Sequence, residues 1–333
     1  MASVGPVGPP SLVVPPRRRG RRSTVRGWRR GDQLIYLLAW AAGIGLCLVA
    51  GAIVVYLGIQ GVRYVDPSLL VSSPSASVDQ AHSGGYLDPI IGTLTLAALG
   101  TVIATPIAVA TALWVVEYGR PRWLAGFVET CIELIAGTPD IVLAIFGLAL
   151  FQFGIFAPLS FRSSGGGVYG RSFFAAGVMV SLLALPMTYT ATRNGLRAIS
   201  RQQREASYAL GKTRIATIRR VLLPSLRADV ATGATLGMGR IIGTTAIVVL
   251  LLGASLQTSP VGTVPLLGFL RGTGSTLTSY VFSNSPSGEG NAPQKAYAAA
   301  FVLILIALLL NAAVARIARM GAAARGVAAR LER

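Results

Sequence analysis

A series of apolar runs, each long enough to cross a bilayer, restricts this chain more than any other feature of its sequence. The hydrocarbon core of a membrane is about 30 Å thick and takes about 20 helical residues to cross. Five runs reach this length, at 33–59, 90–116, 172–192, 228–252 and 296–315. A sixth run, 138–156, is third in order and follows a mixed segment, 123–137, that carries two glutamates. We therefore expect six transmembrane helices.

The composition supports a membrane protein whose secondary structure is helical. Of the residues, 53% are hydrophobic and 13% are charged, which does not suit a soluble domain. A transmembrane barrel would show short segments of alternating polarity, whereas these runs are continuously apolar. The first run is too long for a signal peptide and no small-residue cleavage site follows it, so we interpret it as a retained helix. The expected fold class is all-α integral membrane.

The basic residues predict the orientation, because Lys and Arg in short loops stay on the cytoplasmic side. With the N-terminus inside, 24 of the 30 Lys and Arg residues lie in cytoplasmic segments and five lie in exterior loops. We expect both termini in the cytoplasm. The predicted segments are a disordered basic N-terminus (1–32), a first transmembrane helix (33–60), an extracytoplasmic loop (61–88), a transmembrane core (89–320) and a basic tail (321–333). The exterior segment 254–295 also has the composition of a loop.

Several function classes are disfavoured by the residues themselves. The net charge is +18, yet the arginines lie between apolar runs and do not alternate with aromatics as in a nucleic-acid site. Cys47 and Cys131 belong to different spans, and His82 has no cysteine or carboxylate cluster around it, so neither a disulfide framework nor a metal site is expected. The spans hold no paired acids or Ser/His arrangement, which argues against a membrane-embedded enzyme. A G-x-x-x-x-G-K-S/T loop is missing, so we expect no nucleotide or other cofactor on this chain.

The loop between the fourth and fifth runs, 196–227, has the pattern of a docking element. Small residues, Ala206 and Ser207, let a short helix lie close to another protein. Gly211 permits the positive φ that ends a helix sharply, and Pro224 suits a break before the next helix. Glu205 near the start can anchor the segment through backbone donors or through a basic residue of a partner. The alternative is an ordinary basic amphipathic helix on the inner leaflet.

This loop resembles the EAA loop of ABC importer permeases, whose pattern is E-A-A, three residues, G, nine residues and I-x-L-P. The chain has Glu205-Ala206-Ser207, three residues, Gly211, nine residues and Val221-Leu222-Leu223-Pro224. Four further stretches, at 84–94, 116–119, 134–142 and 259–262, are similar to the PstA-type permease of the phosphate uptake system. The resemblance implies a type I importer core (MetI-like) of helices two to six, with an additional first helix.

The resemblance also implies a function and partners. The chain would be the permease subunit of an ATP-driven inorganic phosphate importer in the inner membrane of a bacterial cell and would form half of the translocation path. Its partners would be a homologous second permease subunit, an extracytoplasmic phosphate-binding protein and two ATP-binding subunits. Those two subunits would hold ATP and Mg and would dock on the EAA loops. Two alternatives stay open: a permease of the same superfamily for another anion or small solute, and a membrane-embedded scaffold or enzyme.

A path for a phosphate dianion needs cationic or N–H groups, since an unpaired charge in hydrocarbon costs many kcal/mol. Arg240 lies inside the fifth run, flanked by Gly237, Gly239 and Gly243, which would admit a ligand or another backbone. The family pattern here is A-R-x-x-G-E-T-A-P, and this chain has Thr244 at the acid and Ile247 at the proline. The missing acid would leave Arg240 freer to meet an anion. The alternative is an arginine that pairs with a neighbouring helix or reaches toward water.

Two other charged residues take part in this prediction. Near the end of the fourth run the family carries a basic residue followed by an acid three positions later, whereas this chain has Thr190 and Arg193. Arg193 is a candidate for the substrate path together with Arg240 and Thr244, or else an anchor at the cytoplasmic surface. Asp140, where the family prefers Ser, is expected to favour the first turn of the third span after Pro139.

Overall fold

The computed structural model describes residues 30–74, 84–160, 170–253, 265–286, 288 and 292–331, with no side chains described for 30, 265, 266 and 317–331. Within these residues the regular elements are all helical, which confirms the predicted fold class. The expected disorder of the N-terminus and the exterior position of His82 fall outside the described residues, except that Arg30–Asp32 already belong to the first helix.

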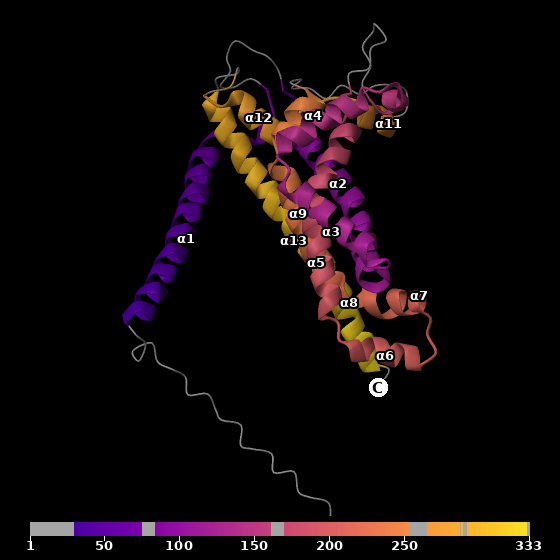
Figure 1. The fold of residues 1–333 in the computed structure, drawn as a ribbon. Coiled ribbons are helices and arrows are strands. Elements are labelled where there is room, and N and C mark those ends of the chain that lie inside the picture. The colour runs from indigo at the N-terminus through magenta and orange to yellow at the C-terminus, as the bar shows by residue number, and fades with distance from the viewer. Residues whose placement is uncertain are drawn as a thin grey trace, which may run out of the picture. The chain divides into compact units, whose positions relative to one another are not determined.

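Four helices are long and apolar enough to cross a membrane by themselves (Figure 1). They are α1 (Arg30–Tyr64), α2 (Leu87–Leu113), α5 (Phe173–Ala198) and α13 (Pro293–Leu331). They coincide with the first, second, fourth and sixth predicted spans. The last helix continues to Leu331, so most of the predicted tail is also helical.

The third predicted span was wrong in its boundaries. The helix α4 (Asp140–Phe151) has 12 residues, and the mixed segment before it forms the helix α3 (Arg122–Gly137). The two meet at a bend of 106° and reach the length and apolarity of one span only together. The bend lies at Thr138–Pro139, because proline lacks an N–H and holds the residue before it in an extended conformation, here with ψ 131° at Thr138.

The fifth predicted span is also broken, into α9 (Arg227–Gly243) and α10 (Ala246–Leu252), which meet at 63°. Thr244 is extended at the bend, with φ −79° and ψ 132°. Its carbonyl oxygen accepts a hydrogen bond from the Thr278 hydroxyl at 3.3 Å. Non-helical backbone at membrane depth persists only where its polar groups find partners, and this hydrogen bond satisfies that need. Counting each bent pair as one span gives the six expected crossings.

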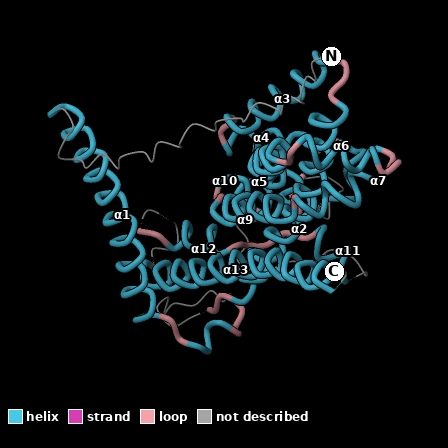
Figure 2. Tube along the Cα trace, turned by 90° about the horizontal axis from the view of Figure 1, so that it is seen from below, coloured by secondary structure: helices cyan, strands magenta, loops and turns pink. Residues whose placement is uncertain are grey.

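The helix α5 packs against both α2 and α9, and these two helices also contact each other (Figure 2). Small residues let these helices approach closely, as is common in membranes. A Cβ atom at Gly177 would lie 2.3 Å from the Leu99 side chain of α2, and one at Gly233 would lie 2.8 Å from Thr188 Cα of α5. The helix α13 covers the outer side of α9.

Alanine at two glycines of α9 should therefore have opposite effects. Gly233→Ala places a methyl group against the backbone of α5 and should lower the free energy of unfolding by about 1–3 kcal/mol through overpacking. At Gly239 no atom lies within 4 Å of an added Cβ, so Gly239→Ala should raise the free energy of unfolding by about 0.5–1 kcal/mol through helix propensity. Thermal unfolding of the two variants in the same detergent measures the difference. Equal melting temperatures would contradict the close approach of α9 to α5.

The predicted exterior loop 254–295 contains two short helices, α11 (Pro265–Arg271) and α12 (Leu277–Asn284), so it is not loop throughout. A capping box between Thr276 and Ser279 starts α12. The N–H of Leu277 donates to the Thr93 hydroxyl of α2 at 2.9 Å. The ring of Tyr280 packs edge-to-face on Tyr86 at 5.5 Å. A 3-10 turn, Pro67–Leu70, also lies in the first predicted exterior loop.

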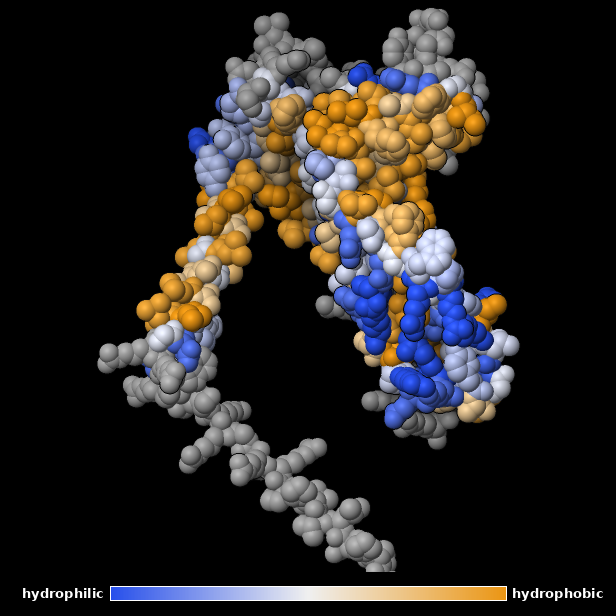
Figure 3. Space-filling view, viewed as in Figure 1, coloured by the Kyte–Doolittle hydropathy of each residue, from blue (hydrophilic) through white to orange (hydrophobic). Residues whose placement is uncertain are grey.

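The bundle has two ends with different surfaces. One end carries α4, α11 and α12, and the other carries α6 (Arg201–Ala209) and α7 (Arg214–Thr217) (Figure 1). On the face shown in Figure 3, hydrophilic residues gather at the α6–α7 end and hydrophobic residues form a band above them. The orientation expected from the basic residues places the α6–α7 end in the cytoplasm.

The chain divides into two units, Met1–Val55 and Tyr56–Arg333, and the boundary lies inside α1. In the first unit the helical residues expose apolar side chains on every side, among them Leu37, Leu46 and Val49. None of the most apolar window of α1 is buried. A helix that is apolar all round suits lipid as its surroundings.

Candidate functional site: a docking segment and a polar junction

The helix α6 ends as the sequence predicts, at a glycine with positive φ. Its N-cap is Ser200, whose hydroxyl accepts from the N–H of Gln203 at 3.4 Å. Gly211 has φ +72°, which confirms the predicted conformation. The N–H of Lys212 donates to the Ser207 carbonyl at 3.2 Å, and the N–H of Gly211 donates to the Tyr208 carbonyl at 2.9 Å. These hydrogen bonds satisfy carbonyls at the helix end and reverse the chain.

The second half of the segment folds back on the first. The helix α7 is followed by a π-helical turn (Ile218–Leu222) and by α8 (Leu223–Ser225), which contains Pro224. Between the two halves, the buried hydroxyls of Ser207 on α6 and Thr217 on α7 lie 2.9 Å apart. Ser207 thus links α6 to α7 and is buried. The sequence had predicted that Ser207 faces a partner protein. The small side chain is needed within the segment itself.

Glu205 has a different partner from the ones expected. Its carboxylate accepts from Arg201 Nε at 2.7 Å, one turn earlier on α6. The two side chains are 58% and 89% exposed, so the pair contributes little to stability. The Glu205 carboxylate therefore remains accessible to another protein.

Apolar side chains on this segment are exposed at the hydrophilic end of the bundle. Tyr208, Leu210 and Ile215 are 41%, 77% and 64% exposed. Ala206 and Ala209 are exposed beside them. An apolar surface rimmed by polar residues, outside the membrane-spanning helices, is typical of a protein-binding site.

The two broken spans meet at a polar junction, formed by Asp140, Arg240 and Thr244. Asp140 is the first residue of α4, next to the bend of its span, and Arg240 and Thr244 lie at the end of α9. Arg240 Nη2 lies 3.5 Å from Asp140 Oδ1, and the Thr244 hydroxyl donates to Asp140 Oδ2 at 3.1 Å. The junction thus joins the start of α4 to the end of α9.

The junction corrects two expectations. Arg240 was expected to lack an acidic partner because position 244 is threonine, but Asp140 of the other broken span supplies the carboxylate. Asp140 was expected to serve mainly the first turn of its own helix. It does lie in that turn, with Pro139 as N-cap, yet its carboxylate is directed at Thr244 and Arg240. Sequence could not pair these residues, because they are 100 and 104 positions apart.

Arg240 is held loosely. The side chains of Arg240 and Asp140 are 28% and 35% exposed, and at 3.5 Å their contact is long for a charge-assisted hydrogen bond. The glycines around Arg240 differ: Gly237 packs on Ala184 of α5, whereas Gly239 and Gly243 have no neighbour within 4 Å of an added Cβ. No atom of the described residues therefore fills the space next to Gly239 and Gly243, whereas α5 fills the space next to Gly237.

Arg193 belongs to a separate cluster, in which its charged partner is Glu129. Its Nη2 lies 2.6 Å from Glu129 of α3, and Arg197 Nη2 lies 3.6 Å from the same carboxylate oxygen. The Tyr189 hydroxyl donates to Glu129 at 3.4 Å. Arg193 Nε is buried and has no hydrogen-bond partner among the described residues. Two arginines on one carboxylate leave the cluster with a net positive charge.

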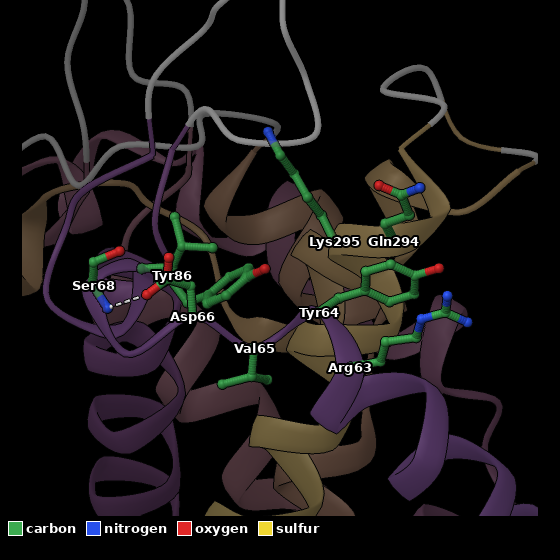
Figure 4. Close-up of a pocket in the computed structure, with 9 residues that line it drawn as sticks. Arg63, Tyr64, Val65, Asp66, Ser68, Tyr86, Gln294 and Lys295 are labelled. Carbon is green, nitrogen blue, oxygen red and sulfur yellow. Dashed lines mark hydrogen bonds between the residues drawn. The ribbon is translucent and has the colours of Figure 1, made fainter.

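A cavity of about 320 Å³ lies away from both groups, where the end of α1 meets the start of α13 (Figure 4). In Figure 4 the side chains of Lys295 and Arg63 point in different directions and do not converge on one point. Asp66 accepts from the N–H of Ser68 at 3.0 Å, and burial raises the pKa of Tyr86 to about 12. This cavity holds none of the residues predicted for the substrate path. No group of His, Cys, Asp and Glu suited to a metal ion occurs among the described residues.

Comparison with known proteins identifies the family. Residues 104–320 match the family described as binding-protein-dependent transport system inner membrane component. The chain belongs to this family. The matched residues include the docking segment, which comprises residues 196–227, and the polar junction. Both therefore lie within the ABC importer permease core.

Several relatives found among characterised proteins are phosphate permeases by name. The chain is 30% identical over 238 residues to the phosphate transport system permease protein PstA 1 of Mycobacterium tuberculosis strain CDC 1551, covering 72% of each chain. It is 29% identical over 248 residues to the phosphate transport system permease protein PstC of Xylella fastidiosa strain 9a5c, covering 69% of this chain and 75% of that one. The resemblance to a PstA-type permease is thereby confirmed.

Solved structures with the same fold are importer permeases. A bacterial ABC transporter that imports alginate superposes with a TM-score of 0.57 at 16% identity and covers 87% of this chain and 96% of that chain. The MetNI methionine ABC transporter in an inward-facing conformation gives 0.52 at 18% identity, covering 70% and 93%. At these identities the likeness concerns the fold, and it confirms the MetI-like architecture. The protein is a multi-pass inner-membrane permease of an ABC importer.

Proposed function

We propose that this chain is the transmembrane permease subunit of an ATP-driven importer of inorganic phosphate, in which it forms one half of the translocation path. The observation that carries the proposal is Arg240, a partly exposed guanidinium at the junction of two broken spans. An anion in the membrane interior needs such a cation, and a guanidinium forms paired hydrogen bonds with phosphate oxygens. The names of the relatives support phosphate as that anion.

Asp140 gives the path a means of releasing its anion. In the described conformation the Asp140 carboxylate already lies beside Arg240 and accepts from Thr244. An arriving phosphate takes the place of this carboxylate at the guanidinium, and the carboxylate returns when the phosphate leaves. A site that both attracts and releases its ligand suits transport better than one of high affinity, because a tightly held ion does not move on.

The segment 196–227 couples this path to ATP hydrolysis on other subunits. Two ATP-binding subunits, which hold ATP and Mg, dock on the exposed apolar side chains of α6 and α7 and on Glu205. When they close, they move the segment from Glu205 to Gly211 as a rigid lever and switch the path between its two openings. The remaining partners are a homologous second permease subunit and an extracytoplasmic phosphate-binding protein. Both termini of this chain then lie in the cytoplasm.

Uptake by the purified complex tests this proposal. The complex of this chain with its co-purifying subunits is placed in proteoliposomes with internal ATP, the binding protein and external radiolabelled phosphate. Saturable, ATP-dependent accumulation of phosphate is the expected result. If phosphate is not taken up while another anion or small solute stimulates the ATPase, the chain remains an importer permease but phosphate is the wrong substrate.

A further inference from the structure

One arginine of the docking segment makes three contacts that tie the segment to the transmembrane bundle. Arg204 of α6 donates from Nε to Glu117 Oε1 at 3.0 Å. Its Nη1 donates to the Ile199 carbonyl at 2.8 Å, and its Nη2 donates to the Leu196 carbonyl at 2.7 Å. These carbonyls lie at the C-terminal end of α5, where helix carbonyls lack intrahelical partners and favour a cation. Arg204 thus joins α6 to the ends of both α5 and α2.

The acidic partner is well shielded from water. Glu117 lies in the π-helical turn Trp114–Tyr118 that ends α2, and its side chain is 8% exposed, against 19% for Arg204. A second arginine of the docking segment reaches the same turn: Arg214 Nη1 donates to the Glu117 carbonyl at 3.2 Å, and its guanidinium lies 5.3 Å from the centre of the Tyr118 ring. Both halves of the docking segment therefore contact the end of α2.

The exposed pair on the same helix provides a contrast. Arg201 and Glu205 lie even closer, 2.7 Å apart, but their side chains are 89% and 58% exposed, so water screens their attraction. Removing one partner of a shielded pair leaves a charge without compensation, which a protein tolerates poorly. The contact between Glu117 and Arg204 is therefore the electrostatic link that holds α6 in a fixed position on the bundle.

The helix α2 connects this link to the opposite end of the bundle. At its start, the Thr93 hydroxyl accepts from the N–H of Leu277 at the start of α12. A Cβ atom at Gly92 would lie 2.0 Å from the Ser275 carbonyl oxygen, so α2 contacts the chain just before α12 directly. The helix α12 in turn holds the bend of the fifth span through Thr278 and Thr244. A displacement of α6 can thus reach the polar junction through rigid, directly contacting elements.

We propose that the Glu117–Arg204 ion pair is the joint that transmits movement of the docking segment to the transmembrane helices. The inference rests on the proposed function in that it takes the docking segment as the contact with ATP-binding subunits. Glu117 and Arg204 are positioning residues and touch neither nucleotide nor substrate. Without the joint, closure of the ATP-binding subunits displaces α6 alone, and ATP is hydrolysed without opening the path.

The ratio of uptake to ATP hydrolysis tests the joint. In the reconstituted full complex, Glu117→Gln and Arg204→Gln should each lower solute taken up per ATP hydrolysed by about tenfold, with the ATP-binding subunits still bound. Arg204→Lys keeps the charge but cannot form the three-way fork, so it should give an intermediate ratio. Arg219→Gln is the matched control, since it removes an exposed positive charge from the same loop. An unchanged ratio in both glutamine variants overturns the proposal, as does a loss that only follows dissociation of the subunits.

A second measurement, of the distance between α2 and α6, tests the joint without any transported substrate. Spin labels at Ala110→Cys on α2 and Gln202→Cys on α6, in a Cys47→Ala/Cys131→Ala background, report the distance between the two helices in the full complex. With the joint intact, the distance distribution should stay narrow and unchanged between nucleotide-free and ATP–vanadate states. It should broaden or shift with ATP–vanadate in Glu117→Gln. An unchanged narrow distribution in that variant overturns the joint, whereas a failure of phosphate uptake in the wild type bears on the proposed substrate alone.

Discussion

Replacing Arg240 with glutamine should lower ATP-dependent phosphate uptake by about tenfold to a hundredfold. A hydrogen bond to a charged group contributes about 1.5–3 kcal/mol, and about 1.4 kcal/mol on a barrier changes a rate tenfold. Glutamine keeps a polar side chain at the junction but loses the charge that offsets the cost of bringing an anion between the helices. Initial rates of radiolabelled phosphate uptake into proteoliposomes, compared with wild type at equal amounts of complex, measure the effect.

Two matched variants separate transport from folding in this experiment. Arg240→Lys keeps the charge and should retain a larger share of uptake than Arg240→Gln. The double variant Asp140→Asn/Arg240→Gln removes both charges, so no charge is left without its counter-ion and its melting temperature should stay near that of wild type. If the stable double variant transports phosphate at the wild-type rate, the ion pair is structural and Arg240 has no part in the path.

The sequence predicted the number and order of the crossings, because a helix of about 20 apolar residues matches the thickness of the hydrocarbon core of a bilayer. It did not predict the bends at Thr138–Pro139 and at Thr244, because a broken span buries as many apolar residues as a straight one. The first bend has a local signal, Pro139, because proline disfavours the helical conformation at the residue before it. The second depends on a hydrogen bond from Thr278, a residue of another element, and has no local signal.

The candidate site likewise has one feature that the sequence predicted and others that it did not. The turn at Gly211 was predictable because its determinants, a helix end and a residue tolerant of positive φ, are local in the chain. The partners of the charged residues were not predictable. Asp140 and Glu129 belong to the broken third span, and Glu117 lies at the end of the second span. Their partners Arg240, Arg193 and Arg204 belong to the fifth span, the fourth span and α6. Charge pairing between helices requires their packing to be known, and a single sequence does not supply it.

Replacing Gly211 with valine should uncouple or disassemble the complex, whereas asparagine at the same position should be tolerated. At φ +72° a β-branched residue costs about 2 kcal/mol relative to glycine, and asparagine is among the few other residues that adopt this conformation readily. No atom lies within 4 Å of an added Cβ, so the two variants differ through the backbone and not through a clash. At about 1.4 kcal/mol per factor of ten, the equilibrium constant for forming the native turn should be about thirtyfold lower in Gly211→Val.

The readouts for this pair are co-purification of the ATP-binding subunits and ATPase stimulation by the binding protein. Both should fall in Gly211→Val and stay near wild type in Gly211→Asn, because the turn sets the angle between α6 and α7 and hence the spacing of Leu210 and Ile215. Normal assembly and stimulation in Gly211→Val would show that the docking segment need not keep this shape. A rigid lever would then be the wrong description of how ATP hydrolysis reaches the membrane.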